Sequence, residues 1–374
     1  MRDAASHSDP VISLAGLRRF RVWVTFLIAF FGGTGVLLGW RLAAERAAQD
    51  RDWRDVMSSE ACDPGLTKAD HDVATDRARR VTVGLYVERI SEVSIRDSRF
   101  RAQLDIWFNW RGDTYDPAAQ LLIVDGVIQS SSLLEQTDEG DRHYRRYKLD
   151  VEIAKTFHIH HFPLDRHLLL IAFEDGSSPR DKLLFEIDRQ DSAVSSRAVV
   201  HGYRLGPLVS LEKPHSYKTS RGRWAESSGT RSTFSQARFG MVIARDSWGP
   251  FVKMFQALFV AVVIALLPCF LRPTDLDPRF GLGVGALFAA VANSYLIGAL
   301  VPDTGEFSLA DQVNLLGIVT ILITLVESTV SLYLYDHRLE RELSRSLDRT
   351  SFVVVSVGFA MAVAMMLLGA SGGW

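Results

Sequence analysis

The chain has 374 residues, and 42 Lys and Arg stand against 44 Asp and Glu, so the formal net charge is −2. This balance argues against a nucleic-acid-binding protein, which would carry a basic surplus or patch. Two cysteines, Cys62 and Cys269, are too few for a disulfide scaffold or a cysteine-rich zinc protein. Hydrophobic residues make up 47% of the chain and concentrate in five long runs, which excludes an ordinary soluble globular protein.

Each of these runs has about the 20 apolar residues that a helix needs to cross a membrane. The runs are Val22–Trp40, Met254–Leu271, Phe280–Val301, Gln312–Tyr335 and Thr350–Trp374. Glu327 is the only charged residue in the fourth run, and we expect it to face a neighbouring helix or water because a charge is costly in lipid. We therefore predict an anchor over residues 22–40 and a four-helix domain over 248–374, with helices near 250–271, 280–301, 312–335 and 350–372.

Basic residues flank the runs asymmetrically, and this predicts the orientation, because cytoplasmic loops carry the excess of Lys and Arg. Arg residues precede the first run and occupy the links between the second and third and between the fourth and fifth, whereas Pro302–Asp311 has none. Residues 1–21 are therefore predicted to be cytoplasmic and residues 41–247 to lie outside. The first run could instead be a signal peptide, but it is long for one and no clean cleavage site follows Trp40.

Residues 80–246 alternate between apolar and polar side chains, which is typical of half-buried strands. Four segments show the pattern most clearly: 81–87, 100–110, 147–153 and 237–243. Turn-forming clusters separate them, and no helical stripe interrupts them. We predict an extracellular antiparallel β-sandwich over residues 76–247, preceded by a periplasmic linker or short helix over 41–75.

Local motifs within this plan resemble one family. Phe162-Pro-Leu-Asp-Arg-His-Leu resembles the Phe-Pro-Phe-Asp loop of pentameric ligand-gated ion channels, the Cys-loop receptor superfamily. Trp110-Arg-Gly-Asp is similar to the end of an early sandwich strand of that family, and Arg279-Phe-Gly-Leu-Gly-Val-Gly-Ala-Leu is similar to the start of its pore helix in anion-channel members. The other matching positions are Arg245, Pro302 and Asp311. Leu169 and Lys155 replace the cysteines that name the family, as is usual in its bacterial branch.

The resemblance covers about residues 80–374 and implies a homopentamer in a bacterial inner membrane. Its partners would be small ions in the pore and an unknown small-molecule, proton or cation ligand in the periplasm. The first apolar run departs from the four-helix plan of the family. We expect no cofactor and no enzymatic activity, because no P-loop, nucleophile elbow or metalloprotease motif occurs.

The third run carries the predicted pore face. Its small and apolar residues are spaced by three or four, so they share one side of a helix. These residues are Gly281, Gly285, Phe288, Ala292, Leu296 and Ala299. In a pentamer, five copies of Phe288 would form a hydrophobic constriction, and five copies of Asp277 would attract cations. The direction of nearby Arg279 cannot be read from sequence, and the small residues could instead serve close packing in a non-conducting bundle.

The resemblance also implies a coupling site and a ligand site. Asp165 and Arg245 would form an ion pair, and Pro163, Leu164 and Asp165 would press on the link Pro302–Phe307. Alternatively, Asp165 is an ordinary turn residue. The ligand would lie under the loop His215–Phe234, where Tyr217 and Trp224 could bind a cation. The basic residues of the same loop would suit an anion, and both aromatics could simply shape the loop.

Histidines crowd the region around Phe162, and they are His158, His160, His161 and His167. The first two could form part of a metal site or a proton sensor, but solvated or core histidines are the simpler interpretation, and we predict no metal site. The main rival to a channel is a non-conducting receptor or periplasmic sensor built on the same bundle. A transporter is less favoured, because no internal repeat is evident.

Overall fold

The computed structural model describes residues 14–62, 75–112, 115–217, 233–245, 248–300, 305–337 and 341–372. The chain divides into two compact units. The helical unit comprises Met1–Ala47, Ile159–Leu164 and Trp248–Trp374, and the sheet unit comprises Ala48–His158 and Asp165–Ser247. Each unit is described by itself below.

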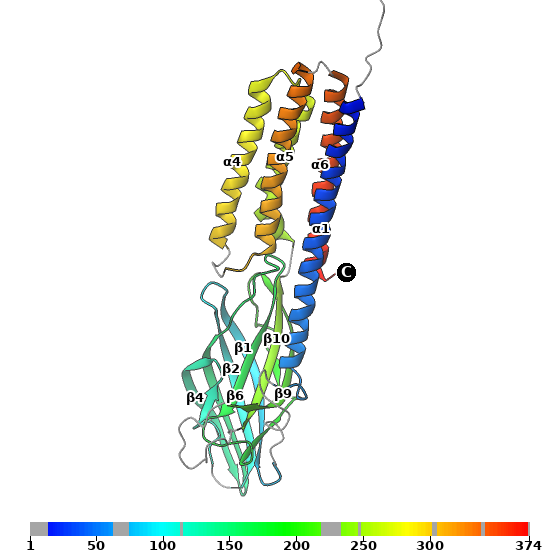
Figure 1. The fold of residues 1–374 in the computed structure, drawn as a ribbon. Helices are drawn as coiled ribbons and strands as arrows, with labels where there is room; N and C mark the ends of the chain where they lie inside the picture. Colours follow the sequence, from blue (N-terminus) through cyan, green and yellow to red (C-terminus); the bar gives the residue numbers. More distant parts are fainter. Residues whose placement is uncertain are drawn as a thin grey trace, which may run out of the picture. The chain divides into compact units, whose positions relative to one another are not determined.

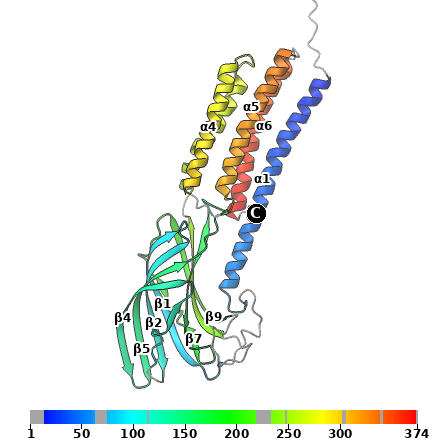
Figure 2. The same cartoon turned by 60° about the vertical axis from the view of Figure 1, so that its left-hand side comes forward.

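The sheet unit consists of two β-sheets (Figures 1 and 2). Its strands are β1 Arg79–Ser94, β2 Arg99–Arg111, β3 Leu121–Ile123, β4 Gly126–Glu139, β5 Arg142–Ala154, β6 Arg166–Asp175, β7 Leu183–Ile187, β8 Ala193–Val194, β9 Tyr203–Ser216 and β10 Thr233–Arg245. One sheet has the order β4-β5-β2-β1-β7, with β8 also paired to β1, and the other has the order β3-β6-β10-β9.

The two sheets share one apolar core, as the alternation of the sequence predicts. Val81, Val83, Leu85 and Val87 of β1 are fully buried, and every second residue of β2 from Phe100 to Trp110 is buried with them. In the opposite sheet, Ala237, Phe239, Met241 and Ile243 of β10 belong to the same cluster, together with residues of β3 and β6. The prediction of a sandwich-like sheet region is thus confirmed.

The prediction of a purely antiparallel sandwich is wrong at one edge. β7 and β8 both pair with β1 in parallel. β6 and β7 belong to different sheets, so the connection Gly176–Lys182 crosses between the layers instead of turning back as a hairpin. A strand that arrives by such a crossover can run in the same direction as its new neighbour.

The helical unit contains α1 Leu14–Val56 as far as Ala47, together with α3 Gly249–Leu266, the short 3₁₀ turn η1 Leu267–Phe270, α4 Leu276–Leu300, α5 Leu309–His337 and α6 Arg341–Ser371. Among the residues that the structure describes, five helical segments are long and apolar enough to cross a membrane: Gly16–Val56, Gly249–Phe270, Leu276–Leu300, Leu309–Asp336 and Arg341–Ser371. A membrane location is therefore plausible for this chain.

Four helices, α1, α4, α5 and α6, are longer than their apolar runs. α1 continues past Trp40 to Val56, so the start of the predicted linker is helical. α6 begins at Arg341, ahead of the predicted start at residue 350, and α4 begins at Leu276. Hydropathy marks the part of a helix that suits lipid, whereas the helix itself extends through Ala, Arg, Glu and Gln, which are all good helix formers.

α1 lies along α6 at a glycine-rich contact, and Figure 2 shows the two helices side by side. A side-chain carbon added at Gly369 would collide with the carbonyl oxygen of Gly39, and one added at Gly358 would meet the ring of Phe31 2.9 Å away. The indole Nε1 of Trp23 donates a hydrogen bond of 3.1 Å to Ser351 Oγ. Small residues let two helix backbones approach closely, so the extra N-terminal helix is an integral part of this bundle.

Candidate functional site

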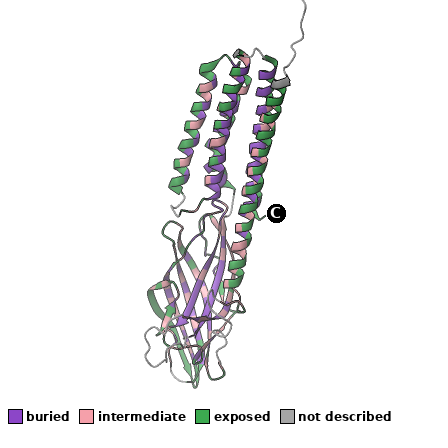
Figure 3. Ribbon diagram, viewed as in Figure 1, coloured by how far each residue is buried: buried purple, intermediate pink, exposed green. Residues whose placement is uncertain are grey.

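The predicted pore residues all lie on one exposed face of α4 (Figure 3). Phe288 is 72% exposed, and no atom lies near the positions where Gly281 and Gly285 would carry side chains. The opposite face is buried and comprises Arg279, Gly283, Ala286, Ala290, Asn293 and Ile297. In the described part of the chain, therefore, the small residues of the predicted face do not serve packing within the bundle.

The buried face of α4 is held against α5 by close packing and by amide hydrogen bonds. Leu325 fills the space beside Gly283, where a larger residue would collide with it. Asn293 Nδ2 donates to Asn314 Oδ1 at 3.1 Å, and both side chains are buried. These contacts hold α4 in one rotation about its axis, with the Phe288 side facing away from its own bundle.

The structure also gives the direction of Arg279. This side chain is 1% exposed, and its Nη2 lies 2.8 Å from Asp348 Oδ2 of α6. Its Nε donates to the carbonyl oxygen of Pro268 at 3.0 Å. Asp277 is exposed in the first turn of the same helix, one turn before Gly281. The Arg279 guanidinium thus points into the bundle, away from the exposed face on which Asp277 lies.

Glu327 belongs to the same buried cluster as Arg279 and Asp348. It is 2% exposed, and the thiol of Cys269 lies 4.0 Å from its Oε2. The cluster joins α5 to η1, and Arg279 and Asp348 join α4 to α6. Glu327 therefore faces other helices of the bundle, in line with the expectation that a charge in an apolar run finds a polar neighbour.

Tyr295 was not among the predicted residues, although it extends the exposed face of α4. It is 78% exposed and lies seven residues after Phe288, which is close to two turns of helix. The spacing alone could have identified it. A second aromatic ring therefore lies on the same side of α4 as Phe288.

Asp165 is the centre of a polar cluster at the end of the sheet unit. It is 1% exposed and accepts hydrogen bonds of 2.6 Å from Arg245 Nε and from His167 Nε2. Burial raises the pKa of Asp165, but the hydrogen bond with His167 and the charge of Arg245 outweigh it and lower the pKa to about 2. Asp165 is thus ionised at neutral pH and paired with Arg245.

The Asp165–Arg245 pair joins the residue at which the chain returns to the sheet unit to a residue close to the last one of that unit, Ser247. The loop Ile159–Leu164, just before Asp165, belongs to the helical unit, and α3 begins shortly after Arg245. The Arg245 guanidinium also lies over the ring of Tyr203, 5.0 Å from its centroid.

Inside the helical unit, the loop Ile159–Leu164 is hydrogen-bonded to the start of α5. The amides of Leu309 and Ala310 donate to the carbonyl oxygens of His160 and Phe162 at 2.8 and 3.1 Å. The amide of Ile159 donates to Glu306 Oε2 at 2.9 Å. Pro163 is buried and Leu164 is half-buried, while the predicted partner Pro302 lies outside the described residues.

Asp311 caps α5 next to this contact. The amide of Ser308 donates to Asp311 Oδ2 at 3.0 Å, and the amide of Asp311 donates back to Ser308 Oγ at 3.2 Å. This reciprocal pair is a capping box, which satisfies backbone donors at a helix start. The cap defines where α5 begins and therefore where the loop Ile159–Leu164 meets it.

His160, His161 and His167 contact different groups within their own units. His161 Nε2 lies 2.9 Å from the carbonyl oxygen of Leu42, and burial lowers its pKa to about 4, so it is neutral at pH 7. His160 lies 3.7 Å from Glu306 and 4.0 Å from Glu45. His167 is hydrogen-bonded to Asp165. His158 is exposed and is the last residue of the segment Ala48–His158 of the sheet unit.

Tyr217 lies at the base of the predicted ligand loop, while Trp224 lies outside the described residues. The Tyr217 hydroxyl donates to the carboxylate of Glu174, and its ring makes edge contacts with His215 and Phe234 at 4.6 and 5.6 Å. Glu174 is 1% exposed and also accepts a bond of 3.0 Å from Gln236. Sequence reasoning missed Glu174, because nothing in the alternation of β6 distinguishes it from other polar strand residues.

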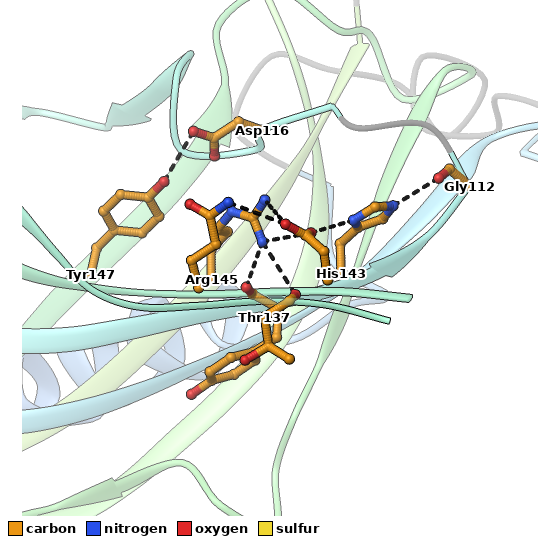
Figure 4. Close-up of polar contacts among 9 residues, drawn as sticks. Gly112, Asp116, Thr137, His143, Arg145 and Tyr147 are labelled. Carbon is orange, nitrogen blue, oxygen red and sulfur yellow. Dashed lines mark hydrogen bonds and ion pairs between the residues drawn. The ribbon is translucent and has the colours of Figure 1, made fainter. Parts of the chain in front are cut away.

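Figure 4 shows a second polar network, on β4 and β5, that the sequence did not reveal. Asp138 Oδ1 accepts from His143 Nδ1 at 2.6 Å, and both Asp138 oxygens accept from Arg145 at 2.8 and 2.9 Å. His143 Nε2 lies 2.9 Å from the carbonyl oxygen of Gly112. Trp110 is 4% exposed and stacks on the His143 ring, with centroids 5.2 Å apart, so its role is packing.

This network makes the stability of the sheet unit depend on pH. The hydrogen bond to Asp138 and then that to Gly112 raise the pKa of His143, so the folded chain binds this proton more tightly than the unfolded chain. The stabilisation is complete below pH 6.5, which is the ordinary pKa of histidine. It is lost as the pH rises through the higher pKa of His143 in the folded chain. We expect the melting temperature to fall over that interval, and His143→Gln to remove this part of the dependence.

Thermal unfolding of the full chain between pH 5 and 9 checks this prediction. The exposed His201 supplies the matched control, and His201→Gln should leave the dependence unchanged. A His143→Gln protein with the same dependence as the unchanged chain would contradict the assignment.

No protein-family model matches this chain, and no curated protein is significantly similar to it in sequence.

Proposed function

We propose that this chain is one subunit of a homopentameric ligand-gated cation channel, similar to the Cys-loop receptor superfamily, in a bacterial inner membrane. The N-terminus is cytoplasmic in this proposal, the sheet unit is periplasmic, and five copies of α4 line the pore. The observation that carries the proposal is the exposed face of α4. Gly281 and Gly285 have open space where a side chain would lie, and Phe288 is 72% exposed, whereas the other side of α4 is buried in the bundle.

The charges of α4 favour cations. Asp277 is exposed on the proposed pore side, and the nearby Arg279 is buried and paired with Asp348. In a pentamer the cytoplasmic mouth would therefore carry five carboxylates that no Arg279 side chain neutralises. Rings of Asp or Glu attract cations into a pore.

The coupling route follows from contacts within each unit. Asp165 and Arg245 join two strand ends of the sheet unit, and the adjoining loop Ile159–Leu164 is hydrogen-bonded to the start of α5. α5 in turn packs on α4 through Asn314 and Leu325. Ligand binding would bias the loop and α5 between two arrangements and so open the constriction at Phe288.

The surroundings of Tyr217 favour a cationic ligand. Aromatic rings attract cations through their π faces, and the carboxylate of Glu174 adds negative charge beside the Tyr217 hydroxyl. Protons and small organic cations both fit this chemistry. These are therefore the first candidates to apply to the purified protein.

Single-channel recording from the reconstituted full chain tests the function, and Asp277→Asn tests the selectivity. One carboxylate 4 Å from a cation contributes about 1 kcal/mol in water, so the loss of five should lower the cation-to-anion permeability ratio at least about fivefold. Glu342→Gln is the control, because Glu342 is exposed at the start of α6 and pairs with Arg345. Its reversal potentials should match those of the unchanged protein.

The outcomes separate the proposal from its rival. If Asp277→Asn and the unchanged protein conduct with the same cation-to-anion permeability ratio, the selectivity filter lies elsewhere in the pore. A protein that is shown to be pentameric and conducts under no tested pH, calcium or amine condition would instead be the non-conducting receptor, with the α4 face serving contacts between subunits.

A further inference from the structure

The helical unit contains an apolar groove that the extra N-terminal helix creates. Its volume is about 930 Å³, at the upper end of the range of roughly 300–1,000 Å³ typical of ligand pockets. α1 forms one wall with Val22 and Phe26, and the end of α5 forms the other with Val330 and Tyr333. Leu343 and Leu347 at the start of α6 close its floor.

The floor of the groove is well packed, so the groove is a built feature of the bundle. Leu334, Leu343 and Leu347 are buried in a cluster against which Phe20 and Trp23 pack. The walls, in contrast, are open, because Val22 is 65% and Phe26 48% exposed. An apolar surface of this size on a membrane-crossing bundle suits acyl chains better than water.

The mouth of the groove is basic. Arg18 and Arg19 line it, and both are exposed. Neither guanidinium makes an ion pair with an acidic side chain in the part of the chain that the structure describes. By comparison, Arg345 on α6 is paired with Glu342 at 3.3 Å. The unneutralised pair of arginines directly adjoins the apolar walls.

We propose that this groove binds one anionic phospholipid of the cytoplasmic leaflet. The phosphate and the negatively charged headgroup would lie against Arg18 and Arg19, and the acyl chains would run along Phe26, Val330 and Tyr333. Basic pockets between membrane helices on the cytoplasmic side are suited to anionic headgroups. A zwitterionic lipid could fill the apolar walls but would have no net charge for the arginines.

The test measures lipid binding to the purified, delipidated full chain by native mass spectrometry. Phosphatidylglycerol and phosphatidylcholine with identical acyl chains are titrated in parallel, and inorganic phosphate is added alone as a third probe. We expect phosphatidylglycerol to bind in preference to phosphatidylcholine. Inorganic phosphate should neither shift the melting temperature nor displace the bound lipid.

Paired variants locate the site. Combined Arg18→Gln and Arg19→Gln should weaken phosphatidylglycerol binding roughly 25-fold, at about fivefold for each basic side chain near the headgroup. Arg21→Gln is the matched control: Arg21 is exposed on the same helix but does not line the groove, so binding should change less than twofold. Val330→Trp, which fills the groove and keeps both arginines, should also abolish high-affinity binding while size-exclusion behaviour is unchanged.

Three results would overturn the proposal. Equal weakening by Arg21→Gln would mean a diffuse basic surface without a site. Equal binding of phosphatidylglycerol and phosphatidylcholine would mean that Arg18 and Arg19 do not favour an anionic headgroup. Absence of binding to the unchanged chain would mean that another occupant, such as residues 1–13 or a second copy, covers the groove. Each readout is independent of conductance, so failure here leaves the proposed channel function untouched.

Discussion

Pentamers that carry Phe288→Ser are expected to conduct without ligand, with a resting current at least about tenfold above that of the unchanged protein. Phe288 is the largest side chain among the predicted pore residues and is 72% exposed in the single chain. Five phenyl rings would form a constriction that excludes water, and five hydroxyls would hydrate it. A tenfold rise in the resting current corresponds to a shift of about 1.4 kcal/mol in the free-energy difference between the closed and open states. Five substitutions can readily supply a shift of this size.

The control for this prediction is a phenylalanine of equal exposure elsewhere in the bundle. Phe270 is 70% exposed and lies in η1, outside α4. Phe270→Ser should therefore leave the resting current unchanged. If both variants behave alike, or if Phe288→Ser alters only thermal stability in a pentameric protein, the Phe288 face is a packing surface and does not line a pore.

Periodicity predicted the sheet unit well because each side chain there faces one of two environments. The alternation over 81–87 and 100–110 corresponds to the buried faces of β1 and β2. Periodicity did not predict the Asp138–His143–Arg145 network, because the network depends on which polar residues lie opposite each other in a hairpin. Asp138 pairs directly with His143 across β4 and β5, so a correct register from the Glu139–Arg142 turn could have found it.

The face of α4 could be predicted from spacing, but its charges could not. The apolar run begins at Phe280, so Asp277 and Arg279 fall in what reads as a link between helices. The helix in fact begins at Leu276, so both residues lie on it and each occupies a definite face. Asp277 is on the same face as Gly281, and Arg279 is on the buried face. Asp348, the partner of Arg279, is 69 residues away, and no local pattern connects them.

The buried pair Arg279–Asp348 leads to the second large effect. Arg279→Gln is expected to destabilise the chain by about 3–5 kcal/mol, because it leaves the carboxylate of Asp348, 4% exposed, without its positive partner. Urea or thermal unfolding in a fixed detergent measures the change. Arg272→Gln, at an exposed arginine between η1 and α4, should stay within about 0.5 kcal/mol.

A double variant separates a broken ion pair from lost packing. If the penalty comes from an unpaired carboxylate, adding Asp348→Asn to Arg279→Gln should recover at least about 1 kcal/mol, because two amides can hydrogen-bond without charge. No recovery would mean that the guanidinium acts through its contact with the Pro268 carbonyl oxygen and through packing.

The same pair bears on function because it fixes the rotation of α4. With Arg279 tied to α6 and to the end of the preceding helix, Asp277 and Phe288 are held on the exposed side. Arg279→Gln pentamers that remain folded should therefore lose cation selectivity together with stability, although the substitution removes a positive charge. A channel that became more cation-selective on losing Arg279 would instead mean that its guanidinium faces the ions.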